Sequence, residues 1–230
     1  MNNLMNRKIL SVFFDGSYEQ KLDNYILTGA FADVKNDVEK YVKSIINIPI
    51  DEVVEYICHD CKRQPIAAAD VFQFSRLEDA THRLCSKMVK ANNLGFRFKD
   101  VAYLLLDDGV QRNEGALNKY GENHIKTAES FGLAFRDSNR NYYLSAVGHV
   151  FDGLESGDRE RLMLRLFIRN KLFVQLFIAA SQGPFELETF LYDLSESTYI
   201  RRRSNINKIV QILNESEEYE FENITKNIIY

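Results

Sequence analysis

The chain has few of the residues that characterise disulfide-linked, collagen-like or membrane-spanning proteins. Its 230 residues include no Trp, 3 Pro, 3 Cys and 11 Gly. Three cysteines cannot all pair, which argues against a disulfide framework and favours a reducing cytoplasm. The scarcity of Pro and Gly disfavours β architectures with many turns and favours helices. No apolar run approaches the roughly 18 residues of a membrane span, and residues 1–8 lack the features of a secretory signal. We therefore expect a cytoplasmic protein with no membrane partner.

What the chain does have is an ordinary globular composition with an uneven distribution of charge. Hydrophobic residues make up 45% and charged residues 27%, which provides for a core and excludes a disordered chain. The net charge of -4 divides into -3 for residues 1–75, +3 for residues 76–213 and -4 for residues 214–230. A pI of about 5.7 argues against an indiscriminate polyanion binder. Any contact with nucleic acid must therefore come from a local cluster of cations.

The N-terminal part of the chain is predicted to be a helical extension. Apolar residues at helical spacing over residues 34–45 predict one helix, and Asp51 stands as the N-cap of a second. The short apolar run at residues 8–14 fits either a buried strand or a helix. We expect residues 1–75 to pack as helices on the module that follows and to contribute no chemistry.

The rest of the chain shows the same order of elements twice. A capping box at residues 75–78 starts a helix, and two more helices and a hairpin with a polar tip follow. This is the order of a winged helix-turn-helix. We predict a mainly α fold with small β-hairpins, in which two winged helix-turn-helix modules, residues 76–152 and 153–230, follow the N-terminal extension. The helices predicted for the first module are 76–91, 99–106 and 113–131, with the hairpin at 132–145. Those of the second are 158–167, 171–180, 185–194 and 198–213, with 219–221 and 228–230 as strands of a second wing.

The densest functional signal is the arginine-rich segment at residues 197–209. An apolar stripe is predicted to face inward: Ile200, Ile206, Ile209, Val210 and Leu213. Polar and cationic residues then face outward or start the helix: Ser197, Thr198, Arg201, Arg202, Ser204, Asn205 and Lys208. In a major groove, Arg reads guanine edges and Asn reads adenine, while Ser, Thr and Lys hold phosphates. The competing interpretation is a solvated face whose arginines pair with neighbouring acidic residues.

Two segments resemble a known class of module. Residues 142–151, Tyr-Tyr-Leu-Ser-Ala-Val-Gly-His-Val-Phe, resemble the transition from wing strand to helix in winged-helix modules of prokaryotic restriction endonucleases and related DNA-binding proteins. The segment from Ser197 to Ile209 resembles a helix often found downstream in such chains, and departs from that pattern at Asn205 and Ile209. The resemblance covers residues 76–230. It implies DNA binding in a restriction, phage-defence or transcription-control setting.

The matching helix of the first module is a second candidate for DNA contact. Its outward polar residues, and two arginines that flank the wing tip, are Lys119, Tyr120, Asn123, His124, Lys126, Arg136 and Arg140. Three glutamates share that helix, which weakens the case for base contact. The alternative role is packing against the second module or a second subunit.

Metal and hydrolytic chemistry are weakly indicated. Cys58 and Cys61 form a CxxC, and His82 and Cys85 follow at a spacing that could complete a zinc site, but free cysteines are often core residues. We predict reduced thiols and no structural zinc. The motif of a magnesium-dependent nuclease is an acidic residue followed by an acidic-x-Lys sequence. Asp15 with Asp33-Val34-Lys35, or with Glu19-Gln20-Lys21, matches it, although the helical context fits such a core poorly.

We expect a DNA-binding protein without a cofactor, and a binder rather than an enzyme. Its partners would be double-stranded DNA and either a second copy of the chain or a nuclease or methyltransferase. Two alternatives stay open. One is a subunit of a magnesium-dependent restriction endonuclease, with Asp15, Asp33 and Lys35 as catalytic candidates. The other is a winged-helix protein-interaction module in which the apolar helices at residues 162–180 form a dimer or partner surface.

Overall fold

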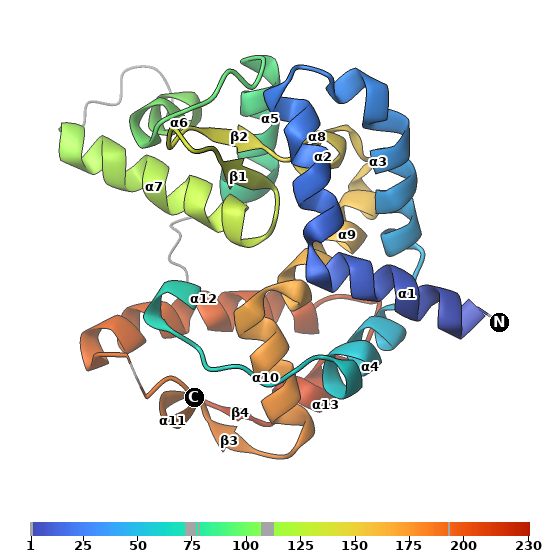
Figure 1. Cartoon of the computed structure of the whole chain (residues 1–230). Coiled ribbons are helices and arrows are strands. Elements are labelled where there is room, and N and C mark those ends of the chain that lie inside the picture. The colour runs from blue at the N-terminus through green and yellow to red at the C-terminus, as the bar shows by residue number, and fades with distance from the viewer. Residues whose placement is uncertain (1, 72–76, 78, 107–112, 193) are drawn as a thin grey trace. The chain divides into compact units, whose positions relative to one another are not determined.

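Helices dominate the chain. The computed structural model describes residues 2–71, 77, 79–106, 113–192 and 194–230. These residues form many helices and two sheets of two strands each (Figure 1). The predicted class, mainly α with small β elements, is confirmed at this level.

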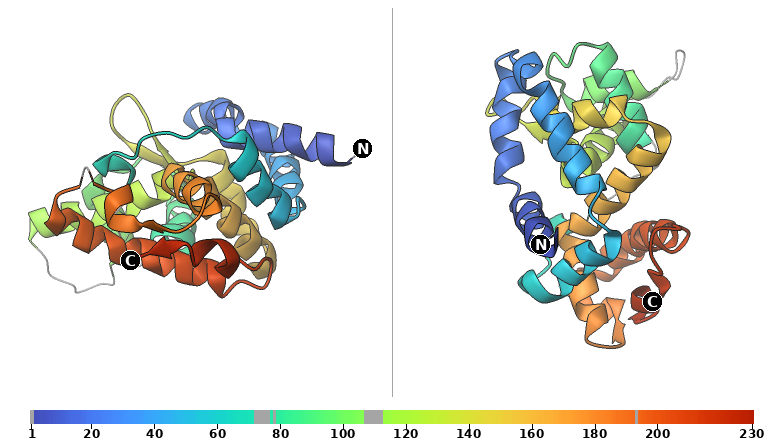
Figure 2. Two further views of the ribbon diagram at one scale, coloured as in Figure 1. Left: turned by 90° about the horizontal axis from the view of Figure 1, so that it is seen from below. Right: turned by 90° about the vertical axis from the view of Figure 1, so that its right-hand side faces the viewer.

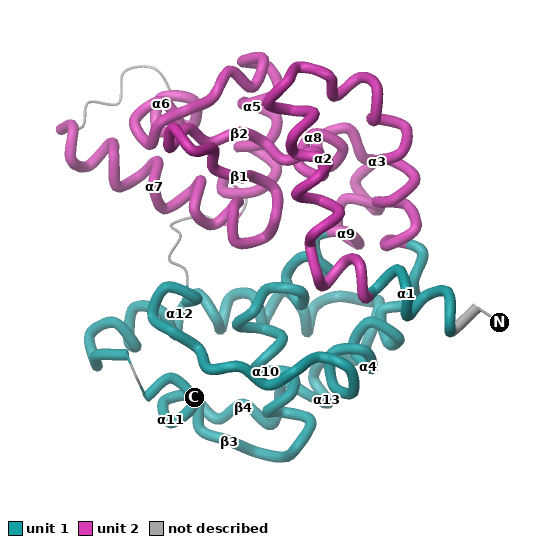
Figure 3. Tube along the Cα trace, in the orientation of Figure 1, with its two compact units in different colours: residues 1–10, 47–73, 163–230 teal, residues 11–46, 74–162 magenta. Residues whose placement is uncertain are grey.

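The chain divides into two compact units that are interleaved along the sequence. Unit 1 comprises residues 1–10, 47–73 and 163–230, and unit 2 comprises residues 11–46 and 74–162 (Figure 3). Each unit therefore draws on segments from both sides of residue 75 and of residue 152, where we placed the predicted domain boundaries. Helices α1 (Asn2–Asp15) and α9 (Ser156–Arg169) each contribute residues to both units.

Unit 2 combines N-terminal helices with the region of the first predicted module. Its remaining elements are α2 (Ser17–Leu27), α3 (Phe31–Ile46), the π-helical turn η2 (Asp79–Arg83), α5 (Leu84–Lys90), α6 (Phe98–Leu105), α7 (Glu114–Ser130), β1 (Ala134–Arg136), β2 (Tyr142–Leu144) and α8 (Ala146–Gly153). Helix α3 buries Val38, Val42 and Ile45 on one face, as the helical spacing predicted. Helices α2 and α3 pack on α8, and α6 packs on α7.

The hairpin of unit 2 has a third strand position beside it. Strands β1 and β2 are antiparallel, with Ala134 opposite Leu144, and Phe96 forms an isolated antiparallel bridge with Tyr142. The Phe96 N–H donates to the Tyr142 carbonyl, and the Tyr142 N–H donates to the Phe96 carbonyl, each at 2.9 Å. Residue 142 therefore lies between Phe96 on one side and Arg136 on the other. The segment before α6 is tied to the sheet in this way.

Unit 1 surrounds one apolar helix. Its other elements are α4 (Ile50–Asp60), the short 3₁₀ helix η1 (Ala68–Asp70), α10 (Lys171–Ser181), β3 (Phe185–Glu186), α11 (Leu187–Phe190), α12 (Glu196–Asn214), α13 (Glu222–Thr225) and β4 (Ile228–Ile229). Residues 172–180 of α10 are all buried, which is the pattern of a helix that is apolar on every side. The apolar side chains of α10 are thus used within the chain and do not form the free partner surface that we considered for residues 162–180.

The predicted second wing is wrong. Residues 219–221 are a turn, and β4 pairs with β3 in parallel, with Phe185 opposite Ile228. Parallel partners need a long connection, and here α11, α12 and α13 provide it. The buried Phe221 ring packs edge-on against Phe177 at a centroid distance of 5.9 Å, so the side chain anchors a turn instead of alternating along a strand.

Several local predictions also change. The run at residues 8–14 is part of helix α1, and the predicted 185–194 helix is the strand β3 followed by the four-residue helix α11. Helix α4 begins at Ile50 after Pro49, so Asp51 lies in its first turn instead of at the N-cap. The capping box depends on Ser75 and Glu78, which lie outside the described residues.

A carboxyl group of unit 2 is held at the start of α8. Asp23 of α2 accepts a hydrogen bond from the backbone N–H of Ala146 at 3.0 Å. One turn earlier on α2, the buried Glu19 accepts a hydrogen bond from the Tyr41 hydroxyl at 2.9 Å. Burial raises the pKa of the Asp23 carboxyl to about 7; the hydrogen bond from Ala146 opposes this shift and the charge of Glu19 adds to it.

This raised pKa predicts a pH-dependent stability. The folded chain keeps the Asp23 proton up to about pH 7, whereas the unfolded chain releases it near pH 3.8. The free energy of unfolding should therefore fall as the pH rises through that window. Urea denaturation at about pH 5 and about pH 8 measures the difference. We expect Asp23→Asn to reduce this pH dependence and Asp33→Asn, at an exposed position of α3, to leave it unchanged. Equal pH dependence in the two variants would contradict this account.

Candidate nucleic-acid interface

Helix α12 carries most of the predicted DNA-binding residues. Its buried residues are Tyr199, Asn205, Ile206, Ile209, Val210 and Leu213. Two predicted orientations are therefore wrong: Ile200 is 55% exposed and Asn205 is only 8% exposed. The buried stripe begins at Tyr199 and continues through Ile206 to Leu213. The helix is therefore rotated relative to the predicted orientation, and Ile200 faces outward. Asn205 consequently leaves the outward set that we expected to reach base edges.

The remaining predicted residues of α12, apart from Arg202, lie on its outer side or at its start. Ser197, Arg201, Ser204 and Lys208 are exposed, and Thr198 and Arg202 are half-buried. The Arg201 side chain bends back along the helix, where its Nε donates to the Ser197 carbonyl at 3.0 Å. The Ser204 hydroxyl donates to the Arg201 carbonyl at 3.0 Å. These local contacts leave the Arg201 guanidinium without a carboxylate partner among the described residues.

Arg203 is a cation that the sequence analysis did not select. Its guanidinium lies 5.8 Å from the centroid of the Tyr199 ring, a distance that fits a cation–π contact. The run of three consecutive arginines was the available signal. We overlooked Arg203 because the predicted stripe assigned the wrong rotation to the helix. We call Arg201, Arg202, Arg203 and Lys208 the arginine face.

The arginine face is electrostatically uncompensated. Within the described part of the chain, none of its four side chains forms an ion pair with a carboxylate. Burial and then the neighbouring charge of Arg201 lower the pKa of Arg202. Like charges that lie this close favour the arrival of an anion, because each phosphate oxygen would relieve the repulsion.

Helix α7 presents the opposite situation. Lys119 pairs with Glu122 at 2.8 Å and Lys126 pairs with Glu129 at 3.0 Å. Asn123 is half-buried, as is Tyr120. His124, which we predicted to face outward, is fully buried, and its Nδ1 lies 2.7 Å from the Tyr120 carbonyl oxygen. The cations of α7 are thus already neutralised by neighbours on the same helix.

Two arginines flank the tip of the unit 2 hairpin. The Arg136 guanidinium lies 5.7 Å from the centroid of the Tyr142 ring, and its residue is exposed. Arg140 is exposed and has a φ of 67°, a left-handed conformation in which side chains other than Gly, Asn and Asp are uncommon. The turn is closed by Asp137, whose carboxylate accepts from the Asn141 backbone at 2.7 Å. The fold therefore holds a cation at a tip position that glycine would occupy with less strain.

The candidate metal ligands fall in different parts of the molecule. Cys58 and Cys61 belong to unit 1, and His82 and Cys85 belong to unit 2. Burial raises the pKa of the Cys61 thiol to about 11 and also raises those of Cys58 and Cys85, which disfavours the thiolate that zinc requires. In the described ranges, no group of three or more His, Cys, Asp or Glu side chains could hold a metal ion.

The letters of the magnesium nuclease lie on helices. Asp15 ends α1, Glu19 and Lys21 are on α2, and Asp33 and Lys35 are on α3. Lys35 is exposed and lies 3.7 Å from Glu39 in an ion pair along the helix. The first strand among the described residues begins at Ala134. The nuclease candidates, at positions 15 to 35, therefore do not lie on or next to strands of the kind that a magnesium nuclease core requires.

Comparison of the chain with protein-family models, curated proteins and solved structures found no match. The resemblance to winged-helix modules therefore stays a prediction. None of the described helices is both long and apolar enough to cross a membrane.

Proposed function

We propose that the protein binds double-stranded DNA, with the arginine face of α12 as its main contact. The observation that carries this proposal is the contrast between two helices. The lysines of α7 are paired with glutamates, whereas the four cations of α12 have no carboxylate partner in the described structure. Phosphates of a DNA backbone are anions with the spacing and charge density that such a face attracts.

The outer side of α12 supports contacts of two kinds. Ser197, Thr198, Ser204 and Lys208 can donate hydrogen bonds to phosphates. Arg201 and Arg202 can meet either phosphates or guanine edges. Arg203 stacks on Tyr199, which holds its guanidinium close to the helix surface.

Unit 2 supports a second contact. Its order of helix, bridged strand position, two packed helices and hairpin is the order of a winged helix, with α7 in the place of the recognition helix and residues 137–141 as the wing tip. Strained residues persist where function requires them, so the left-handed conformation of Arg140 favours a role in binding. The proposed contacts of this unit are Asn123, Arg136 and Arg140, whereas Lys119 and Lys126 are paired with glutamates and are not among them. The setting in restriction, phage defence or transcription control rests on the resemblance of residues 142–151.

Fluorescence anisotropy with duplex DNA tests the proposal. Each arginine that meets a base edge should contribute about 1–3 kcal/mol, so Arg201→Ala and Arg202→Ala should each weaken specific binding roughly fivefold or more. A Lys119→Ala/Lys126→Ala variant is the matched control, because those lysines are already paired. We expect it to bind DNA more nearly as the unmodified chain does.

The thermal midpoint of each variant separates binding from packing. Arg201 is exposed, so Arg201→Ala should melt close to the unmodified chain. Arg202 is half-buried on the same face as Tyr199 and Ile206, so Arg202→Ala should melt lower than Arg201→Ala does. If both variants melt early and bind DNA as before, α12 is a packing helix and the proposal fails.

A further inference from the structure

An irregular segment of unit 1 crosses the apolar helix α10. Residues 62–67 adopt neither helix nor strand, and η1 and Val71 follow them. This segment crosses α10 in Figure 1, and the view from below in Figure 2 shows it on the opposite side of α10 from α12. We call residues 62–71 the strap.

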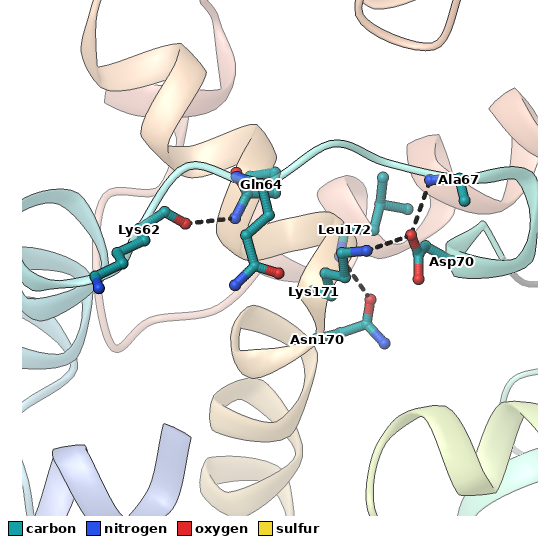
Figure 4. Close-up of polar contacts among 8 residues, drawn as sticks. Lys62, Gln64, Ala67, Asp70, Asn170, Lys171 and Leu172 are labelled. Atoms are coloured by element: carbon teal, nitrogen blue, oxygen red, sulfur yellow. Dashed lines mark hydrogen bonds and ion pairs between the residues drawn. The ribbon is translucent and has the colours of Figure 1, made fainter. Parts of the chain in front are cut away.

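One buried glutamine of α10 holds the backbone of the strap. The Gln64 backbone N–H donates to Gln175 Oε1 at 2.7 Å, and Gln175 Nε2 donates to the Lys62 carbonyl at 3.1 Å (Figure 4). Gln175 is 3% exposed. The Gln175 amide thus accepts from one backbone N–H of the strap and donates to the carbonyl two residues earlier. A neighbouring β-strand would make the same pair of hydrogen bonds to the backbone. These contacts involve only the backbone of the strap, so they impose no side chain at residues 62 and 64.

Charged and polar side chains set the register at both ends. Lys171, at the start of α10, pairs with Asp70 at 2.7 Å, and the same Asp70 oxygen accepts from the Ala67 backbone at 2.8 Å (Figure 4). Arg63 Nη1 donates to Gln182, just beyond the end of α10, at 3.4 Å. The strap therefore runs antiparallel to α10, because its contacts from Arg63 to Asp70 are with successively earlier residues of the chain, from Gln182 to Lys171. A docked peptide would bind in the same way.

The strap itself is weakly anchored by apolar burial. Seven of its residues are exposed: Lys62, Arg63, Gln64, Pro65, Ala67, Ala68 and Ala69. Ile66 is half-buried, and Val71 is the buried apolar residue of the segment. Segments with few buried apolar contacts open at low free-energy cost, whereas the helix beneath is buried throughout residues 172–180. Opening the strap would thus free the amide of Gln175, which binds the strap backbone, on the side of α10 that the strap crosses.

We propose that the face of α10 beneath the strap is a binding site for an extended peptide segment, and that the strap occupies it as an intramolecular ligand. The ligand class follows from the contacts. It is an extended segment whose backbone offers Gln175 one N–H and, two residues earlier, one carbonyl. Six residues after that N–H it has a carboxylate that pairs with Lys171, and an apolar residue follows the carboxylate. This site uses none of the α12 residues that we propose to bind DNA, and its inference does not rest on that proposal.

The probe is a fluorescent peptide with the sequence of residues 62–71. In the unmodified chain the tethered strap competes at a high effective concentration, so the peptide should bind weakly. A full-length Gln64→Pro/Asp70→Ala variant removes the N–H that Gln175 accepts and the carboxylate that Lys171 pairs with. We expect this variant to bind the peptide at least tenfold more tightly than the unmodified chain does.

The matched control is the same peptide N-methylated at the Gln64 amide, which can no longer donate to Gln175 Oε1. We expect it to bind the opened variant at least tenfold more weakly than the unmodified peptide. Equal binding of the two peptides, or no binding by a folded opened variant, would overturn the proposal. Hydrogen exchange of the unmodified chain provides a measurement that needs no variant. The Gln64 amide should exchange more slowly than that of Arg63, and unprotected exchange at Gln64 would also overturn the proposal.

Discussion

Replacing Gly121 with alanine is expected to destabilise the chain by about 3 kcal/mol or more. A Cβ at this position of α7 would lie 1.7 Å from the Phe98 carbonyl oxygen and 2.7 Å from its carbonyl carbon. Both atoms belong to the backbone of α6, so no side-chain rotation can relieve the clash, and α6 and α7 would have to separate. Overpacking of this kind typically costs about 1–3 kcal/mol, and a backbone approach this short belongs at or above the upper end. Urea denaturation measures the decrease in stability.

Gly115 provides the control on the same helix. It is exposed, and the nearest atom to an added Cβ is Asn113 Oδ1 at 3.6 Å. Gly115→Ala should therefore stabilise the chain by about 0.5–1 kcal/mol, because alanine has the higher helix propensity. If the two substitutions shift the free energy of unfolding in the same direction, the close approach of α6 and α7 is not what requires Gly121.

The second large effect is expected at a buried cation of unit 1. Arg165 of α9 is 2% exposed, and its guanidinium pairs with Glu218 at 2.9 Å and donates to the Ile48 carbonyl at 2.6 Å. Glu218→Ala removes the carboxylate of this ion pair while the guanidinium stays buried. Removal of one partner of a buried pair costs about 3–5 kcal/mol, and we expect a value at or below the lower bound because Glu218 is itself partly exposed and Arg165 keeps its bond to the Ile48 carbonyl.

Two further variants isolate the cause. Glu217 is an exposed carboxylate next to Glu218 in the sequence, and Glu217→Ala should change the free energy of unfolding by less than about 0.5 kcal/mol. Arg165→Met removes the buried charge itself and should cost less than Glu218→Ala does. Equal stability of the Glu217 and Glu218 variants in urea denaturation would contradict a structural role for the ion pair.

The helices could be predicted from local pattern because their signals lie within one turn of the chain. Apolar spacing located α3, α6, α7, α9 and α10 to within about one to three residues of their observed ends. Gly121, in contrast, has a low helix propensity, and the sequence alone gives no reason for a glycine at this position of α7. Its role comes from the approach of Phe98, a contact between helices that local pattern does not contain.

The partners of the short strands could not be predicted for the same reason. The β1–β2 hairpin was predicted because its strands are joined by a short polar turn. The pairing of β3 with β4 joins residues 185 and 228 across three helices, and nothing in either dipeptide specifies the other. Local signals likewise gave no indication that α1 and α9 would each contribute residues to both units.

Composition located the arginine face, but only the fold gave its rotation. Tyr199 is buried because it precedes Ile206 by seven residues, or about two helical turns, whereas Ile200 precedes Ile206 by six and points about 120° away from that face. A stripe assigned by hydrophobicity alone therefore placed Asn205 outward and passed over Arg203. On α7, the i,i+3 spacing of the two lysine–glutamate pairs could be read from the sequence, but the burial of His124 could not.

The most direct test of the DNA-binding proposal is the salt dependence of duplex binding. The logarithm of the binding constant falls linearly with the logarithm of the salt concentration, by about 0.9 for each phosphate that a protein cation neutralises on B-DNA. We expect an Arg201→Ala/Arg202→Ala/Lys208→Ala variant to bind less tightly and to show a shallower slope, reduced by about 0.9 for each phosphate that the variant no longer neutralises. An affinity and a slope equal to those of the unmodified chain would contradict the claim that the arginine face of α12 binds DNA.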